Sequence, residues 1–507
     1  MQTTRQEQDS IGKVDLPAGC LHGIQTERAR RNFPITGVPL SHFPALVRSL
    51  AMVKSAAARA NAETGGLVPD KAEAIAAVCA EIIGGRHHEH FSVDMIQGGA
   101  GTSTNMNANE VIANLALLWM GHPPGSYAQL HPNDDVNHGQ STNDVYPTAI
   151  RLAVLASTAP LCEVLHRLQQ AFDGRARAFD GITKVGRTQL QDAVPMPLGM
   201  EFAAFSVTVG EDIDRLRDVS QLLTEVNLGG TAIGTGINAE PGYAPLALKY
   251  LSELSGFDLK QAGNLIEASS DLGAFVAYSG ILKRVAVKLS KICNDLRLLS
   301  SGPRAGFGEI TLPAVQAGSS IMPGKVNPVI PEVVNQVCFQ VIGNDLTVTM
   351  AAEAGQLQLN AMEPVMAYNL LESIRILKNA VEALTENCVK GITANPDRCA
   401  ALLDNSLVLA TALAPYLGYD AAAAIARRQP VGAELAQFGD AERIGGARVA
   451  PAHVPRVFGH DRGAALASHG GGEHRLVELG ELLLHEERDL EIAGDVHGAV
   501  VRGLDPA

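Results

Sequence analysis

Aromatic residues are scarce in this chain of 507 residues: Phe, Trp and Tyr together make up 4%, and there is one Trp. Charged residues are also few, at 19%, whereas hydrophobic residues reach 46%. Ala, Leu and Val are plentiful, a balance that favours helices packed on helices over sheets. The composition therefore predicts an all-α protein with a large buried core, part of which lies between subunits.

An excess of cationic residues is also missing. The chain has 40 Lys and Arg against 54 Asp and Glu, a net charge of −14. This argues against nucleic acid or an anionic membrane as the main partner, because both attract basic surfaces. It does not exclude an anionic small-molecule substrate, since a local cluster of Lys, Arg and helix N-termini can reverse the field inside one cleft.

Signs of disulfide bonds and of membrane targeting are absent. The seven cysteines are an odd number, are widely spaced and form no C-x-x-C pair, which is typical of buried, reduced thiols in a cytosolic protein. The first residues are polar, unlike a signal peptide. No apolar run approaches the ~18 residues of a membrane span. The sequence predicts a cytoplasmic protein with no membrane partner.

Several familiar catalytic motifs are missing too. There is no G-x-x-x-x-G-K-[ST] phosphate loop, no G-x-S-x-G elbow and no zinc-ligand spacing. The run from His87 to His90 reads His-His-Glu-His, which is not H-E-x-x-H. Because neighbouring positions on a helix point in different directions, we interpret it as a solvated helix end. No metal site is predicted.

The length exceeds the usual limit for one core, so two or three structural units are expected. Residues 11–43 are loop-rich, and helical periodicity begins near Ala45, over 70–83 and over 110–120. Long apolar-periodic segments follow Pro147, over residues 148–180, 199–226, 243–254, 271–301, 330–352 and 366–390. We predict a mostly helical N-terminal domain (1–145), a central long-helix bundle (146–398) and a C-terminal region (399–507).

The last part of the chain has a different composition. Residues 430–507 contain no Lys, Asn, Thr, Tyr, Met, Cys or Trp, yet hold six of the fifteen histidines. Three interpretations stay open: a divergent C-terminal domain, a partly disordered acidic tail, or the product of a shifted reading frame.

Four polar clusters, far apart in the sequence, each begin at a glycine. They are residues 101–107, 139–144, 186–192 and 318–328. Each offers uncharged hydrogen-bond donors near a helix end, where free backbone N–H groups also point outward. The fourth reads Gly-Ser-Ser-Ile-Met-Pro-Gly-Lys-Val-Asn-Pro and suits a mobile lid that carries chemistry. Together the clusters predict a pocket that neutralises carboxylates with many donors and few full charges.

Each cluster alone also has a structural explanation. Ser141 and Thr142 are typical helix caps, and Thr188 and Asp192 are typical turn residues. Ser319, taken alone, is a loop hydroxyl that hydrogen-bonds the backbone. No single cluster therefore decides between a structural and a functional interpretation.

Taken together and in this order, the clusters resemble the signatures of the fumarase/aspartase superfamily of lyases, from about residue 5 to about residue 426. Three strings, over residues 97–110, 140–144 and 354–364, resemble aspartate ammonia-lyases more than class II fumarases. Gln189 points the same way, because fumarases carry a histidine there that pairs with a glutamate, here Glu332. Beyond about Gln429 the resemblance ends, and the small helical C-terminal domain of the family cannot be matched to residues 430–507.

This resemblance implies an all-α fold with a long-helix central bundle and smaller N- and C-terminal domains. It also implies a homotetramer with a shared multi-helix core, in which three subunits build each active site. The implied reaction is the elimination of ammonia from L-aspartate to give fumarate. No organic cofactor is implied, although a divalent cation can activate members of the family.

The resemblance further assigns roles to single residues. Ser319 is the expected base, assisted by Lys325 and by backbone N–H groups of the closed lid. The expected substrate-binding residues are Thr102, Ser141, Thr142 and Ser320 for the β-carboxylate, Lys325 and Asn327 for the α-carboxylate with Thr188 nearby, and Asn143 and Gln189 for the amino group.

Three alternatives remain. A class II fumarate hydratase shares the fold and the carboxylate pocket. A non-catalytic protein on a lyase fold is the alternative of another class, although such recruits need not keep Ser319, Lys325 and Asn327. The third is a lyase inactivated by a damaged C-terminus. Argininosuccinate and adenylosuccinate lyases differ inside the lid motif and fit less well.

Overall fold

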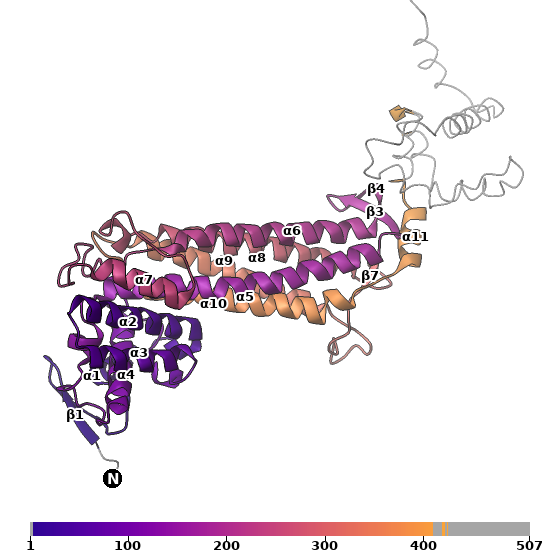
Figure 1. The fold of residues 1–507 in the computed structure, drawn as a ribbon. Coiled ribbons are helices and arrows are strands. Elements are labelled where there is room, and N and C mark those ends of the chain that lie inside the picture. Colours follow the sequence, from indigo (N-terminus) through magenta and orange to yellow (C-terminus); the bar gives the residue numbers. More distant parts are fainter. Residues whose placement is uncertain (1–3, 409–417, 421–422, 424–507) are drawn as a thin grey trace, which may run out of the picture. The chain divides into compact units, whose positions relative to one another are not determined.

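The computed structural model describes residues 4–408, 418–420 and 423. Helices account for most of this part of the chain (Figure 1). The α-helices are α1 (Ile24–Asn32), α2 (Pro44–Thr64), α3 (Pro69–Ile83), α4 (Thr102–Trp119), α5 (Thr142–Ala178), α6 (Leu198–Ser220), α7 (Tyr243–Ser255), α8 (Gly273–Leu299), α9 (Val329–Glu353), α10 (Glu363–Asn387) and α11 (Pro396–Asp404). The prediction of an all-α fold is confirmed. The three interpretations of residues 430–507 lie outside the described residues.

Four small two-stranded sheets accompany the helices. They pair β1 (Thr4–Gln8) with β2 (Lys13–Pro17), β3 (Thr183–Thr188) with β4 (Gln191–Pro197), β5 (Glu225–Val226) with β6 (Lys260–Gln261), and β7 (Ile310–Thr311) with β8 (Thr393–Ala394). The β5–β6 pair is parallel and the other three are antiparallel. None of these strands was predicted: four have two residues, too few for an alternating pattern to be visible, and the other four have five to seven.

The chain forms two compact units. Unit 1 comprises residues 1–174, 204–299 and 312–392, and unit 2 comprises residues 175–203, 300–311 and 393–507. Both units are therefore assembled from segments far apart in the sequence. The domain boundaries at residues 145 and 398 stay a prediction.

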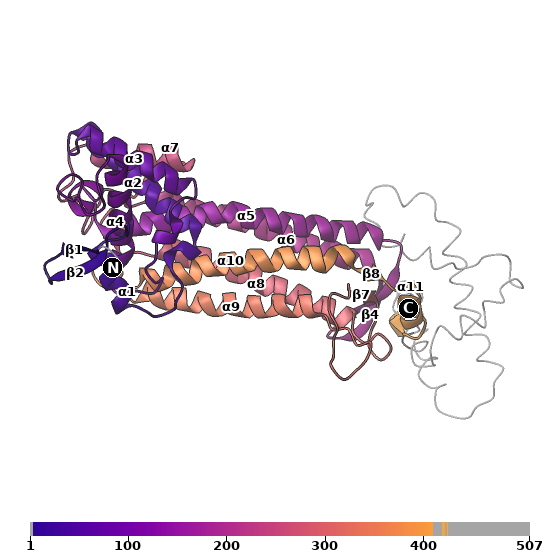
Figure 2. The same cartoon turned by 90° about the horizontal axis from the view of Figure 1, so that it is seen from below.

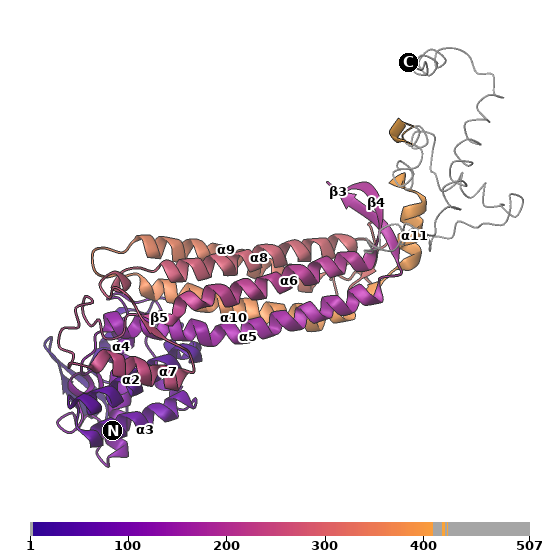
Figure 3. The same ribbon diagram turned by 45° about the horizontal axis from the view of Figure 1, so that its top comes forward.

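Unit 1 contains a bundle of long helices. Within it, α5, α6, α8, α9 and α10 run side by side, and α2, α3, α4 and α7 gather at one end of the bundle (Figures 1 and 2). Helices α8 and α9 are antiparallel neighbours (Figure 3): Ser279 donates to Asp345 at 2.8 Å, and Asn335 donates to the Ser290 hydroxyl at 2.8 Å. The predicted long-helix bundle is thus present, and the boundaries of α7, α8, α9 and α10 lie within three residues of their predicted positions.

Helix α5 begins at Thr142, whereas the predicted long segment begins after Pro147. A proline inside a helix leaves the carbonyl four residues earlier without its usual N–H donor. Here that carbonyl belongs to Asn143, and the side-chain amide of Asn227 donates to it at 2.9 Å. The expectation of a helix start after Pro147 was wrong because a distant side chain replaces the missing backbone bond.

Two further sequence expectations need correction. Residues 11–43 were expected to form loops, but they contain strand β2 and helix α1. Helix α4 was expected to start at Glu110, but it starts at Thr102. The Thr/Asn-rich segment is helical because its side chains find partners outside the helix, so they do not compete with its backbone bonds.

Helix α5 is also long and apolar enough to cross a membrane, by length and composition alone. Its 18-residue window has a mean hydropathy of 1.4, and 72% of that window is buried inside the protein. The expectation that no segment reaches this length and hydropathy was therefore wrong. The burial is that of the core helix of a bundle.

A buried carboxylate attaches α1 to α4. Glu110 of α4 accepts backbone N–H bonds from Gly23 and Gln25 at 2.8 Å and from Thr26 at 3.0 Å. It also accepts the Thr26 hydroxyl at 2.6 Å. Burial raises the pKa of Glu110, and these hydrogen bonds act in the opposite direction. The carboxylate thus occupies the N-terminus of α1, where free N–H groups and the helix dipole favour a negative charge.

Gly23 permits this contact, and replacing it with Ala tests the arrangement. A Cβ at this position would lie 2.7 Å from Glu110 Cδ and 2.8 Å from Glu7 Oε2. We expect Gly23→Ala to lower the free energy of unfolding by about 1–3 kcal/mol, the usual cost of forcing extra volume into a packed site. The melting temperature measures the effect.

Gly19→Ala is the matched control, because a Cβ at Gly19 meets nothing within 4 Å. Neither glycine has a positive φ, so backbone freedom does not separate the two variants. Equal melting temperatures for the two variants would contradict the role assigned to the Gly23–Glu110 contact.

Candidate active site

The turn that begins α5 holds three of the predicted substrate-binding residues. Ser141 and Asp144 form a capping box: the Asp144 carboxylate accepts the Ser141 N–H at 2.9 Å, and the Ser141 hydroxyl accepts the Asn143 N–H at 3.2 Å. The Asn143 side chain donates to the Ala232 carbonyl at 2.8 Å. Ser141, Thr142 and Asn143 are all half-buried. The structural role expected for Ser141, a helix cap, is therefore present and leaves its side chain partly accessible.

Asp144 itself is fully buried. Besides Ser141, the backbone N–H groups of Gly229 and Thr231 each donate to it at 3.0 Å. Burial raises the pKa of Asp144, while these hydrogen bonds and the charge of Lys54 lower it. One carboxylate thus joins the start of α5 to the 227–232 loop.

Asn137 is the centre of a second network beside this turn. Its side-chain oxygen accepts from Lys54 at 2.8 Å, from Asn105 at 3.0 Å and from Asn109 at 3.2 Å. Asn105 also donates to the Thr142 hydroxyl at 3.2 Å. Elements from four parts of the chain therefore meet around Thr142.

Lys54 is buried in this network and was missed by the sequence analysis. It also donates to the Gln140 side chain at 3.0 Å, and burial lowers its pKa to about 7. A signal was available, because Lys54 lies on the apolar stripe of α2 that contains Leu50 and Ala57. A lone lysine among buried apolar residues of a helix has to find polar partners.

Thr102 is the first residue of α4 and is exposed. Its hydroxyl donates to the Gly99 carbonyl at 2.7 Å. The preceding Gly101 has φ 86°, and a Cβ there would lie 2.2 Å from the Tyr146 ring. Only glycine fits this contact, which brings the start of α4 against the first turns of α5. Thr102 is thus placed at the same end of the bundle as Ser141.

A second buried acid lies at this end of the bundle. Glu363 begins α10, and burial raises its pKa to about 8 although the charge of Arg151 lowers it. One of its carboxylate oxygens has no hydrogen-bond partner among the described residues. The end of unit 1 that holds Thr102 and Ser141 therefore combines several neutral donors with buried charged groups.

The predicted lid forms a closed loop before α9. The Gly318 N–H donates to the Lys325 carbonyl at 2.8 Å, and the Asn327 side chain donates to the Gly318 carbonyl at 2.7 Å. Ser320 and Lys325 are exposed, and Ser319 and Asn327 are half-buried. The structure brings these four predicted residues together on one short segment.

The Ser319 hydroxyl has a specific environment in this loop. Its oxygen accepts two backbone N–H bonds, from Ile321 at 3.2 Å and from Met322 at 2.9 Å. Donors aimed at an oxygen stabilise its anionic form over its neutral form. The loop therefore offers to Ser319 the backbone assistance that the sequence analysis expected.

The two groups of residues lie at opposite ends of the bundle within one chain. Asn344 of α9 donates to Ser373 of α10, and Arg151 of α5 interacts with Glu363, so the start of α5 lies at the same end as Glu363. The lid instead precedes the first residue of α9, and α9 has 25 residues. A helix of this length spans about 37 Å. One chain therefore does not bring Ser319 to Ser141.

The remaining predicted residues, Thr188 and Gln189, belong to unit 2. Gln189 and Leu190 form the two-residue turn between β3 and β4, with φ values of 53° and 63°. Asn and Gly usually occupy such turns, so the backbone here is strained. Thr188 and Gln189 are exposed. Thr188 is the last residue of β3 and directly precedes this turn, so its interpretation as a turn residue is close to the observed geometry.

The two groups of predicted residues offer different chemical groups. Hydroxyl and amide groups at the N-termini of α4 and α5 are the kind of donors that hold carboxylates. The loop hydroxyl of Ser319 has the donors that a base of this type needs. Within the described residues, the group of side chains suited to hold a metal ion is His87, Glu89 and His90, outside the four clusters.

The chain is similar to a known protein family and to several known proteins. A family model described as "Lyase" matches residues 12–343. The aspartate ammonia-lyase of Pseudomonas aeruginosa is 62% identical over 426 residues, which cover 84% of this chain and 90% of that protein.

Two solved structures are also similar. A fumarate lyase:delta crystallin from Brucella melitensis bound to cobalt has a TM-score of 0.83 and 56% identity, and the match covers 95% of this chain and 99% of that one. The class II fumarase of Schistosoma mansoni has a TM-score of 0.80 and 35% identity, over 84% of this chain and 92% of that one. This chain therefore belongs to the lyase family, within the fumarase/aspartase superfamily that its motifs resemble.

Proposed function

We infer that this protein is an aspartate ammonia-lyase, which removes ammonia from L-aspartate by a reversible anti elimination to give fumarate. Curated relatives with this name are up to 62% identical to the chain, whereas the similar class II fumarase structure is 35% identical. Gln189 also replaces the histidine of the fumarase proton relay. The observation that carries the chemistry is the pair of backbone N–H groups that donate to Ser319.

The difficult step is the removal of a weakly acidic proton from the carbon next to the β-carboxylate. A serine hydroxyl is too weakly acidic to be ionised at pH 7 without help. We propose that the Ser319 hydroxyl first releases its own proton to solvent water, that the N–H groups of Ile321 and Met322, with Lys325, stabilise the resulting alkoxide, and that the alkoxide then takes the substrate proton. Closure of the lid over the substrate excludes water and strengthens these interactions.

The electrons of the broken C–H bond then move toward the β-carboxylate, which becomes an enediolate with two negative charges. They return to form the carbon–carbon double bond as ammonia leaves the α-carbon. Preorganised donors aimed at the enediolate oxygens lower the barrier, by about 3 kcal/mol for one well-placed donor. We assign this role to Thr102, Ser141, Thr142 and Ser320, the α-carboxylate to Lys325 and Asn327 with Thr188 nearby, and the amino group to Asn143 and Gln189.

We propose that each active site is shared between three subunits of a homotetramer. Helix α9 spans about 37 Å and keeps Ser319 and Ser141 at opposite ends of the bundle within a chain, so we propose that an antiparallel neighbour supplies the lid. In such a pair, the lid end of one bundle meets the pocket end of the other.

Exposed apolar side chains on the bundle support this assembly. On α9 they are Phe339, Leu346 and Met350, each at least 60% exposed, spaced by seven and four residues and therefore on one face. Val207 of α6 and Val287 of α8 are also exposed, at 61% and 52%. Apolar stripes of this kind on otherwise buried helices are typical of subunit interfaces.

We propose that no organic cofactor is required and that a divalent cation can activate the enzyme. The relative from Brucella melitensis whose structure is described as bound to cobalt supports the second statement. We also propose the cytoplasm as its compartment, because all seven cysteines are free thiols and six of them are buried.

Adding the purified protein to L-aspartate and, separately, to malate tests the assignment. Fumarate absorbance is expected to appear with L-aspartate. The alternative, a class II fumarate hydratase, predicts fumarate from malate instead. No fumarate from either substrate would favour the non-catalytic or C-terminally damaged alternatives.

Ser319→Ala tests the proposed base. We expect turnover to fall by about 10²–10⁴-fold, the usual contribution of a positioned proton acceptor, because alanine cannot take the proton. The melting temperature is expected to change little, since the side chain is half-buried and its partners are loop N–H groups.

Ser301→Ala is the matched control. Ser301 is also a half-buried loop serine that accepts a backbone N–H, from Phe307 at 3.1 Å, but it lies outside the four clusters. If Ser319→Ala keeps a turnover close to that of the unchanged protein, Ser319 is not the base.

Phe339→Asp tests the shared site. A charge on the exposed apolar face of α9 is expected to weaken the association of subunits, so that sedimentation velocity reports species smaller than a tetramer and activity is lost with assembly. Ile11→Asp, at a side chain 78% exposed outside the bundle, is expected to keep both. A fully active monomer would rule out the shared site.

A further inference from the structure

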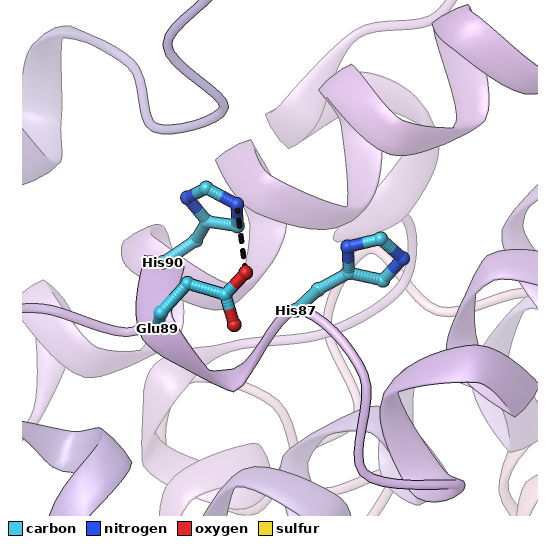
Figure 4. Close-up of side chains that lie close together, drawn as sticks. All are labelled: His87, Glu89 and His90. Atoms are coloured by element: carbon cyan, nitrogen blue, oxygen red, sulfur yellow. Dashed lines mark ion pairs between the residues drawn. The ribbon is translucent and has the colours of Figure 1, made fainter.

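The short turn after α3 gathers two histidines and a glutamate. The ligand-type atoms of His87, Glu89 and His90 all lie within 4.8 Å of one another (Figure 4). Residues 88–90 form a 3₁₀ turn, in which positions three apart lie above one another. His87 directly precedes this turn, and its ring stacks on that of His90, with centroids 6.4 Å apart and an interplanar angle of 26°.

The three histidines of this run are all half-buried, and they face in two directions. His88 turns away from the other two: its Nε2 lies 2.8 Å from the Ile82 carbonyl, and its ring packs edge-on against Phe91. His87 and His90 instead face the Glu89 carboxylate, and His90 Nε2 lies 3.5 Å from Glu89 Oε1 (Figure 4). The neighbouring side chains of His87 and His88 thus point in different directions, as expected, whereas His87 and His90, three residues apart, come together.

The backbone of His87 is held in the left-handed region, with φ 65° and ψ 10°. This conformation is uncommon outside glycine, although histidine adopts it more readily than most residues. It directs the His87 ring toward Glu89 and His90. Strained backbone positions of this kind concentrate at sites that bind ligands.

A fourth side chain supports the His87 ring from behind. Glu81 Oε2 lies 2.8 Å from His87 Nε2, so the second ring nitrogen, Nδ1, remains for another partner. One ring nitrogen of His87 faces the Glu89 carboxylate in Figure 4. A carboxylate that holds one nitrogen while the other binds a metal ion is the arrangement that orients most histidine ligands in metal sites.

We propose that His87, Glu89 and His90 bind a divalent transition-metal ion of the zinc and cobalt class, oriented by Glu81. Two imidazole nitrogens and one carboxylate oxygen form a ligand set that suits these ions, with water completing the coordination. Mg²⁺ and Ca²⁺ prefer oxygen ligands and fit it poorly. Glu89 is exposed and both histidines are half-buried, so the ion can reach the site from solvent.

The site has a structural connection to α4. The His90 carbonyl accepts the Asn107 side-chain amide at 3.1 Å, and the Asn107 side chain also accepts the Ser92 N–H at 2.9 Å. Asn107 lies in the second turn of the helix that starts at Thr102. A bound ion would therefore stabilise the turn between α3 and α4, and we expect it to raise the melting temperature because only the folded turn binds it.

Calorimetric titration of the full-length protein with Zn²⁺ and Co²⁺, with Mg²⁺ as the comparison ion, tests the proposal. The key variant is His87→Asn, because asparagine tolerates the left-handed backbone and removes the imidazole. We expect one Zn²⁺ or Co²⁺ binding event per chain to weaken at least tenfold in His87→Asn. Glu81→Gln is expected to weaken it about 10–100-fold, as loss of a supporting carboxylate usually does.

His88→Gln is the matched control, since His88 belongs to the same turn but faces Ile82 and Phe91. It is expected to bind the ions like the unchanged protein. If His87→Asn lowers the melting temperature in the absence of metal, the affinity of His90→Gln for Zn²⁺ and Co²⁺ is used instead, because this variant keeps His87 and its left-handed backbone. Unchanged Zn²⁺ and Co²⁺ affinity in both His87→Asn and His90→Gln, or equal affinity for Mg²⁺, would overturn the proposal.

Discussion

Burial of the Asp144 carboxylate organises the polar end of unit 1. A buried charge is costly unless hydrogen bonds replace its lost water. Three backbone N–H groups, from Ser141, Gly229 and Thr231, supply those bonds. Because each bond needs a specific backbone position, the carboxylate fixes the start of α5 against the 227–231 loop. The Ser141 and Thr142 hydroxyls and the Asn143 amide then lie at the N-terminal end of α5, a place suited to bind carboxylates.

The length of α9 imposes the second constraint. Its 25 residues keep the Ser319 loop and the Ser141 turn at opposite ends of one bundle. A rigid helix cannot bend far enough to join them, and for this reason the site that we propose is built from more than one chain. The exposed apolar face around Phe339 and Leu346 is consistent with that requirement. Catalysis and assembly are therefore coupled in the function that we propose.

Two positions show how this fold holds unfavourable backbone conformations. Gln189 and Leu190 both adopt positive φ in a tight turn, supported by the pairing of β3 with β4. His87 adopts positive φ between α3 and the following 3₁₀ turn. None of these residues is glycine, so the surrounding structure has to offset the strain. The first turn presents the exposed side chain of Gln189, and the second presents the half-buried ring of His87.

The sequence by itself determined the helical architecture and predicted the four polar clusters as the place of the chemistry. Apolar periodicity placed α8, α9 and α10 to within a few residues, and the Ser319–Asn327 segment indicated a lid. Local patterns encode such features, because helix periodicity and loop composition depend on neighbouring residues. The start of α5 at Thr142 was not predictable in this way, since the Asn227 side chain that permits Pro147 lies 80 residues later.

Only the tertiary structure decided which polar groups meet. Contacts between distant segments place Lys54, Asn137 and Asp144 beside the start of α5, and no local pattern specifies such contacts. The left-handed backbone of His87 and the turn that follows it likewise bring His87 and His90 together around Glu89, and neither backbone angle is visible in the sequence. Side-chain convergence depends on backbone angles and packing in three dimensions, whereas residue type and spacing are already present in the sequence.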